Sequence, residues 1–234
     1  MPIIKKQDGA GEGDVEAFLE RVRQMPAPPK PSGSSGRLVL AMDATMSRQH
    51  SWDMALGIQG NMFAEAGRVG GLNVQLVYFR GAGECRASKW TPDTSTLARL
   101  MSGIRCQGGS TQILRVLKHL RTEATAGKVN ACVYIGDALE EPIDALAAIA
   151  GEVGLLGVPV FMFQEGRDRA AEAGFREIAR LTRGAYFHFG ADAANILREL
   201  LAAVAVYAAG GYMALENHSA SHGGAAALLL RQMG

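Results

Sequence analysis

The chain has 234 residues, of which 48% are hydrophobic and 20% are charged. This length is ample for one well-buried domain and short for two, and the composition is that of a folded globular protein rather than of a disordered one. Lys and Arg (24) nearly balance Asp and Glu (23), and the net charge of +1 argues against a nucleic-acid partner or an acidic membrane surface.

Cysteine usage and hydropathy indicate a soluble protein of a reducing compartment. The three cysteines show no CxxC spacing, which fits small buried thiols better than a disulfide framework. The N-terminal MPIIKKQDGAGEGD lacks the apolar core of a signal peptide. The longest apolar run, Leu200 to Tyr212, is about 13 residues long, whereas a membrane span needs ~20. We expect a cytoplasmic protein without a membrane partner.

Residues 1–36 are predicted to form a flexible N-terminal arm. Its segment PAPPKPSGSSG holds four of the eight prolines, and such a segment buries too little apolar surface to offset its ordering entropy. Within the arm, residues 14–24 (DVEAFLERVRQ) have apolar side chains at helical spacing, which predicts a short amphipathic helix. This helix rests on its own domain in the simpler interpretation, and docks on a partner in the alternative.

From residue 37 onward, apolar runs alternate with segments of helical periodicity. Residues 38–42 (LVLAM) form a continuous apolar run, as expected of a central strand that is covered on both faces. A helix over 51–66 follows, then a strand over 71–80 and a short antiparallel edge strand over 84–90.

The second half of the chain repeats this alternation. We expect helices over 94–101, 111–125, 143–153, 168–182 and 191–208, and strands over 129–135, 158–163 and 185–189. Strands separated by helices indicate a parallel sheet with right-handed crossovers. The predicted fold, over residues 37–209, is a Rossmann-like three-layer α/β/α sandwich whose mostly parallel sheet has one antiparallel edge strand. Residues 210–234 are predicted to be a tail in which 225–230 forms a short helix that packs on the domain.

Oxygen-bearing side chains follow two of the apolar strands. Asp43, Thr45 and Ser47 lie at alternate positions in DATMS, directly after the first strand, and Asp137 ends a later one. The loop CQGGST, residues 106–111, comes just before a helix. Because ligand sites of open α/β sheets lie beyond the carboxyl ends of the strands, we expect these three segments to meet.

The expected site offers oxygen donors alone. The carboxylates of Asp43 and Asp137 join the hydroxyls of Thr45, Ser47 and Thr111, without histidine or thiol. Hard oxygen donors favour Mg²⁺, with Mn²⁺ or Ca²⁺ as alternatives, and argue against zinc or copper. So few anionic ligands leave an open coordination position, which water or the carboxylate of a partner can fill.

Local roles are the alternative for some of these side chains. Ser47 or Ser51 could cap the following helix, and Asp43 could accept backbone N–H groups at a strand–helix corner. In GGST we assign Thr111 as the ligand, since Ser110 suits the N-cap of the next helix.

Together the segments resemble the metal-ion-dependent adhesion site (MIDAS) of von Willebrand factor type A (VWA) domains. DATMS resembles the DxSxS motif of that family, with Thr45 in place of the first serine. GGSTQI resembles its threonine loop, and YIGD resembles the later strand that ends in aspartate. The three parts occur in the order of the family, and the resemblance covers about residues 37–209.

The resemblance implies a binding module and not an enzyme. The hydroxyls of Ser47, Thr45 and Thr111 would contact the ion directly or through water, whereas Asp43 and Asp137 would orient bound water and neutralise charge. An Asp or Glu of a protein partner would complete the coordination. The resemblance also implies an adaptor role in multiprotein assemblies, and the small, signal-free format suggests a cytoplasmic bacterial member.

A second resemblance is to the haloacid dehalogenase phosphohydrolases and phosphotransferases. There an aspartate at the tip of the first strand, here Asp43, is the nucleophile, and an acidic loop such as GDALEE holds Mg²⁺. Thr45 stands where the phosphatases carry a second aspartate, and no apolar strand ends in Ser or Thr at the expected second motif. The candidate lysines are Lys118 and Lys128. These departures favour the binding module.

The five histidines show no metal-binding spacing and are interpreted as surface or packing residues, including His218 and His222 in the tail.

Overall fold

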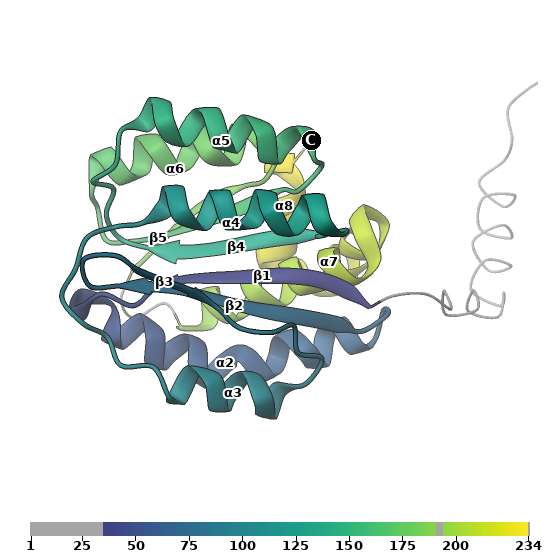
Figure 1. Cartoon of the computed structure of the whole chain (residues 1–234). Coiled ribbons are helices and arrows are strands. Elements are labelled where there is room, and N and C mark those ends of the chain that lie inside the picture. Colours follow the sequence, from purple (N-terminus) through teal and green to yellow (C-terminus); the bar gives the residue numbers. More distant parts are fainter. Residues whose placement is uncertain (1–34, 191–193, 234) are drawn as a thin grey trace, which may run out of the picture. The chain divides into compact units, whose positions relative to one another are not determined.

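The computed structural model describes residues 35–190 and 194–233. Within these limits the chain forms a six-stranded sheet between two layers of helices (Figure 1). The predicted N-terminal arm, with its helix over 14–24, lies outside the described residues except for its last two positions.

The sheet has the strand order β3-β2-β1-β4-β5-β6. Neighbouring strands pair in parallel except for β3, which runs antiparallel to β2 at one edge. This arrangement confirms the predicted fold class. The strands are β1 (Gly36–Asp43), β2 (Leu72–Arg80), β3 (Glu84–Ala87), β4 (Ala131–Gly136), β5 (Val160–Glu165) and β6 (Tyr186–Phe189).

The edge strand β3 is shorter than the predicted strand over 84–90. It ends at Ala87, because the N–H of Leu76 on β2 is taken by the Ser88 hydroxyl at 3.0 Å rather than by a strand carbonyl. Beyond this point, Thr91 forms a single bridge with Val74.

Helices cover both faces of the sheet, as Figure 1 shows. One layer consists of α2 (Gln49–Gly67), α3 (Thr94–Ser102), α7 (Ala194–His222) and α8 (Gly224–Met233); the other consists of α4 (Ile113–Ala126), α5 (Ile143–Leu155) and α6 (Arg169–Leu181). A short 3-10 helix, η1 (Met46–Arg48), joins β1 to α2.

Alternate residues of β1 enter the two halves of the core. Leu38, Leu40 and Met42 pack in the half that contains α2 and α7, whereas Val39 and Ala41 pack in the half that contains α4, α5 and α6. All five are at most 1% exposed. Burial on both faces explains why this strand is an uninterrupted apolar run.

Helix α7 consists of two helical stretches joined at Gly211, whose φ of 75° is not helical, and the predicted helix over 191–208 corresponds to the first stretch. Among the described helices, it alone is long and apolar enough to cross a membrane by length and composition, with a mean hydropathy of 1.3. Half of that apolar stretch is buried inside the domain, where α7 packs on α2 and β1. After the bend, Leu215 and Leu229 are fully buried, so the C-terminal helices complete this face of the core.

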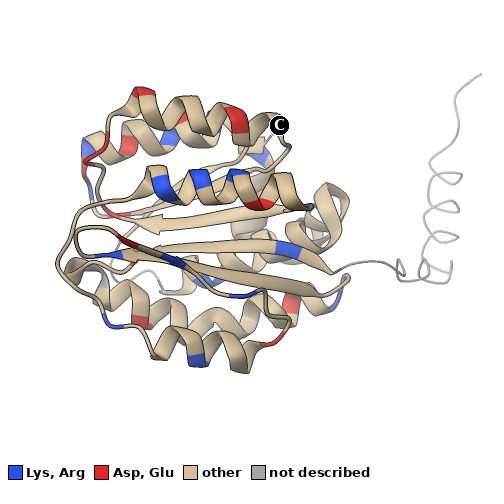
Figure 2. Cartoon of the chain, in the orientation of Figure 1, with Lys and Arg blue, Asp and Glu red and all other residues tan. Residues whose placement is uncertain are grey.

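Charged side chains of both signs are interspersed over the helices (Figure 2). The basic side chains of α4 are partly engaged within the domain. Arg121 pairs with Glu152 of α5 at 2.6 Å, and Arg115 donates to the carbonyl of Gly83. Two of the basic side chains of α4 therefore interact with neighbouring elements.

Candidate metal centre

Strand β1 ends in a buried carboxylate that organises the following turn. Asp43 is the last residue of the strand and is only 2% exposed. Its Oδ1 accepts the N–H of Thr45 at 2.7 Å, and the N–H of Ala44 donates to the carbonyl of Phe79 on β2 at 2.9 Å. These two bonds fix the direction in which the chain, with its hydroxyl groups, leaves the sheet.

Side chains from two strand ends form a hydrogen-bonded group. Thr45 Oγ1 and Ser47 Oγ are 3.3 Å apart, and Ser47 Oγ donates to Asp137 Oδ2 at 3.1 Å. Asp137 follows β4, which pairs in parallel with β1, so both strand ends lie at the same edge. The structure thus brings together Asp43, Thr45, Ser47 and Asp137, called the oxygen cluster below.

The Gly-rich loop before α4 is tied to the same end of β1. The N–H of Gln107 donates to the carbonyl of Ala44 at 3.0 Å. Gly109 lies so close to Gly81 that a Cβ at position 109 would overlap the backbone there. Glycine at this position therefore lets the loop pack against the turn after β2, since any side chain would hold it away.

Thr111 joins a neighbouring network. Its hydroxyl accepts the N–H of Glu140 at 3.1 Å, and its own N–H donates to Glu140 Oε2 at 3.1 Å. Within the described residues, Thr111 has no direct hydrogen bond to the oxygen cluster; it borders the cluster through the loop that also carries Asp137. The bond from Glu140 uses one of the two acceptor positions of the hydroxyl, and the other remains for a ligand.

The prediction that Ser110 caps the following helix is wrong. Ser110 is exposed, and the N-cap position of α4 is Gln112, whose side chain does not cap. Glu141 takes this role: its carboxylate accepts the N–H groups of Ile113 at 2.6 Å and Leu114 at 2.9 Å. A carboxylate at a helix N-terminus also interacts favourably with the helix dipole. No local sequence pattern signals this contact, because Glu141 is 27 and 28 residues away from its two partners along the chain.

The donors of the oxygen cluster suit a hard cation. Across residues 35–190 and 194–233, no three His, Cys, Asp or Glu side chains are grouped so that they could hold a metal ion. A metal centre at this edge therefore depends on hydroxyls together with the two aspartates. Thr45 is available for this purpose, because it occupies the N-cap position of η1 without a capping bond from its side chain. Oxygen donors of this kind fit Mg²⁺.

The surface next to the oxygen cluster can be reached by a partner. Met46, between the two hydroxyl residues, is 64% exposed. On another side, Asp137 borders a cavity of about 370 Å³ that is also lined by Glu165, Asp168 and His188. A ligand bound at the oxygen cluster would therefore also contact the apolar side chain of Met46 and the polar cavity beside Asp137.

Of the two lysines considered for phosphoryl transfer, Lys128 lies away from Asp43. Lys118 is exposed on α4. Lys128 follows α4, and its carbonyl accepts a hydrogen bond from Arg37 at 3.4 Å. Arg37 belongs to the beginning of β1 and Asp43 to its end, so Lys128 lies at the opposite edge of the sheet.

No family profile matches the chain, and no curated protein matches it. Solved structures do resemble it. A von Willebrand factor type A protein from Catenulispora acidiphila gives a TM-score of 0.61 at 16% identity, over 74% of this chain and 43% of that one. The SpRpn10 VWA domain gives 0.54 at 10% identity, over 68% and 90%. Proximal thread matrix protein 1 from the mussel byssus, with a zinc-occupied MIDAS motif, gives 0.57 at 12% identity, over 73% and 46%.

These likenesses show that the chain has the VWA fold, as the resemblance of its motifs implied. At sequence identities of 10–16%, these solved structures are evidence of a shared fold alone. The chain spans less than half of the Catenulispora and byssus proteins.

Proposed function

We propose that this VWA-fold chain is a metal-dependent protein–protein interaction module, an adaptor whose bound Mg²⁺ accepts an Asp or Glu carboxylate of a partner protein. The observation that carries the proposal is the oxygen cluster, in which Ser47 links Thr45 to Asp137 beside the buried Asp43. Asp43 also organises the local turn, but the bond from Ser47 to Asp137 joins two separate strand ends and is not needed for that turn, whereas each member of the cluster has a role in a cation site.

The roles follow from the chemistry of each group. The hydroxyls of Thr45 and Ser47 would hold the ion, with Thr111 as a third hydroxyl from the neighbouring loop. Asp43 and Asp137 would accept hydrogen bonds from bound water and balance charge. When bound, the ion supplies a positive charge with an open coordination position. Because its direct ligands are neutral, it keeps its attraction for an anionic oxygen from outside.

The assignment of Mg²⁺ rests on donor chemistry. Oxygen donors without nitrogen or sulfur favour Mg²⁺, and Mn²⁺ or Ca²⁺ share this preference. The byssus protein of the same fold has a zinc-occupied MIDAS motif, which supports a divalent ion at this place in the fold.

Binding is proposed rather than catalysis. Asp43, the nucleophile of the phosphohydrolase hypothesis, is buried and already accepts the N–H of Thr45. Such a carboxylate is suited to balancing charge, and Lys128 lies at the opposite edge of the sheet. Exposed Met46 adds an apolar contact for a partner. The proposed place of action is the cytoplasm, with which the three free thiols agree.

Affinity capture from an extract of the source organism tests this function. The wild-type chain, the Ser47→Ala/Asp137→Ala double variant and an Asp144→Ala control are compared in Mg²⁺, and bound protein is released with EDTA. Asp144 is an exposed carboxylate of α5 outside the oxygen cluster, so its loss should change nothing. We expect a partner that EDTA releases from the wild type and the control and that the double variant fails to retain. Capture that survives both EDTA and the double substitution would overturn the proposal.

A further inference from the structure

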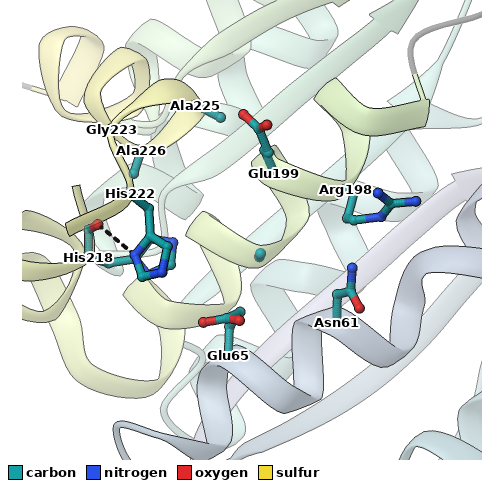
Figure 3. A pocket seen from close by; sticks show the side chains of 10 residues that line it. Asn61, Glu65, Arg198, Glu199, His218, His222, Gly223, Ala225 and Ala226 are labelled. Carbon is teal, nitrogen blue, oxygen red and sulfur yellow. Dashed lines mark hydrogen bonds between the residues drawn. The ribbon is translucent and has the colours of Figure 1, made fainter. Parts of the chain in front are cut away.

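A cavity of about 340 Å³ lies between α2, α7 and α8 (Figure 3). It is lined by Asn61 and Glu65 of α2, by Arg198 and Glu199 near the start of α7, and by His218 and His222 from the part of α7 beyond the bend. The oxygen cluster precedes the first turn of α2, whereas Glu65 lies in the last turn of that helix. The cavity is therefore separate from the candidate metal centre, and it offers nitrogen donors that the centre lacks.

From the sequence, His218 and His222 were interpreted as surface or packing residues without metal-binding spacing, but the tail is helical here and makes them neighbours. Their spacing of four residues places both rings on one face of α7, with ring centroids 4.4 Å apart and planes 22° apart. His222 Nδ1 lies 3.2 Å from the carbonyl oxygen of His218. Since a carbonyl can only accept, Nδ1 carries the proton, and in the neutral ring Nε2 therefore has the lone pair. Metal-binding histidines use this arrangement, in which one ring nitrogen donates to a backbone carbonyl and the other binds the ion.

The neutral form of the His218 ring is favoured, and negative charge lies beside both rings. Burial, followed by the neighbouring His222, lowers the pKa of His218 below 6.5, which favours the neutral ring that a ligand must be. The negative charge of Glu65, on α2, opposes this shift and raises the pKa of the His218 ring. Figure 3 shows Glu65 and Glu199 in the same cavity as the stacked imidazoles, with Arg198 at one side.

The Glu65 carboxylate can leave its present ion-pair partner, Arg68. It pairs with Arg68 at 2.7 Å, and the Arg68 side chain is 66% exposed. An exposed ion pair of this kind contributes little stability, so a metal ion competes readily with Arg68 for the carboxylate. Glu199 adds a second negative charge to the cavity, and within the described residues it forms no ion pair.

We propose that His218, His222 and Glu65 form a second metal site, for a borderline-soft transition-metal ion of the Zn²⁺ class. Two imidazole nitrogens and one carboxylate oxygen are donors that Zn²⁺ accepts, whereas Mg²⁺ prefers oxygen. The three side chains do not converge in the structure. Binding requires Glu65 to rotate from Arg68 toward the rings, which its half-buried position permits. The bound ion fastens the end of α7 beyond Gly211 to α2.

Zinc titration of the tag-free full chain carrying Asp43→Ala tests the site, because that substitution disables the oxygen cluster and leaves the cavity intact. ZnCl₂ and MgCl₂ are compared by calorimetry and thermal unfolding. Zn²⁺ should bind and raise the melting temperature, and Mg²⁺ should do neither. Adding His218→Ala or His222→Ala should weaken zinc binding by about tenfold or more, and Glu65→Gln should weaken it less. His119→Ala removes a histidine of α4, in the opposite layer of helices, and should leave zinc affinity unchanged.

Two results would overturn this site. One is equal zinc affinity in the His218→Ala/His222→Ala double variant and its Asp43→Ala parent. The other is zinc affinity that stays constant as the pH falls from about 7.5 to about 5.5, since protonated imidazole has no lone pair for the ion. Failure of the wild-type chain to bind Mg²⁺ would contradict the proposed function and leave the zinc site standing.

Discussion

Thr45 is the position where the first motif departs from the DxSxS pattern, and its surroundings explain how the chain accepts the change. Thr45 is 8% exposed, and its hydroxyl lies 3.3 Å from Ser47 Oγ. The additional methyl group of threonine is therefore buried while the hydroxyl still faces the oxygen cluster. The hydroxyl and not the methyl group is the feature that a metal site requires.

Substitutions at Thr45 separate these two groups. Thr45→Ser keeps the oxygen and should leave Mg²⁺ affinity within about threefold, whereas Thr45→Val keeps the shape and should weaken it by about tenfold or more. Calorimetric titration with MgCl₂ measures both variants. Equal affinities for the serine and valine variants would show that Thr45 is not a ligand.

The candidate site could be predicted from sequence only in part. DATMS and YIGD each follow an apolar strand, and the ends of parallel strands share an edge, so the meeting of Ser47 with Asp137 could be foreseen. The bonds of Glu140 and Glu141 to the start of α4 could not. They join residues 27–29 positions apart and depend on the path of the loop after β4, which no local pattern specifies.

The N-terminus of helix α4 is capped by Glu141, which lies in the loop after β4. Glu141→Ala removes the carboxylate that accepts two N–H groups of α4 and should lower the free energy of unfolding by about 1–2 kcal/mol. Ser110→Ala, at the exposed position that sequence reasoning favoured, should change it by less than about 0.5 kcal/mol. Urea unfolding measures both values, and a larger loss for Ser110→Ala would contradict this assignment.

Helix α3 has a local cap whose charge makes it sensitive to acid. Bonds from the Ser95 hydroxyl and the Thr96 N–H, both at 2.7 Å, lower the pKa of Asp93 from 3.8 to about 2. Since the folded-state pKa is depressed, the stabilisation is complete above pH 3.8 and is lost as the pH falls through about 2.

Asp93→Asn keeps the capping oxygen and removes the charge. The variant should therefore melt below the wild type at neutral pH, and the gap should close as the pH falls from 3.8 toward 2. Thermal unfolding followed by circular dichroism across this range measures the gap. A gap that is constant with pH would show that the charge of Asp93 does not stabilise α3.

At the scale of the whole domain, alternation of strands and helices predicted the layers, because each apolar run needs cover on two faces. The strand order β3-β2-β1-β4-β5-β6 depends on which strands pair with each other during folding. The hydrophobic periodicity of the sequence does not specify that pairing. The pair Gly210-Gly211 has the composition of a helix end, and the helix is interrupted there, at the non-helical backbone of Gly211, before a second helical stretch begins. Buried Leu215 in this second stretch and buried Leu229 in α8 show what these segments do: they cover apolar surface that the first stretch of α7 leaves open.

Thermal unfolding with and without MgCl₂ tests most directly whether the oxygen cluster binds Mg²⁺. At a Mg²⁺ concentration of about one hundred times Kd, binding to the folded state adds about 2.7 kcal/mol. For a domain of this size the melting temperature should then rise by roughly 5–10 °C in the wild type and in Asp144→Ala. Asp43→Ala should show no rise. An equal rise in the wild type and in Asp43→Ala, or no rise in the wild type, would contradict the account.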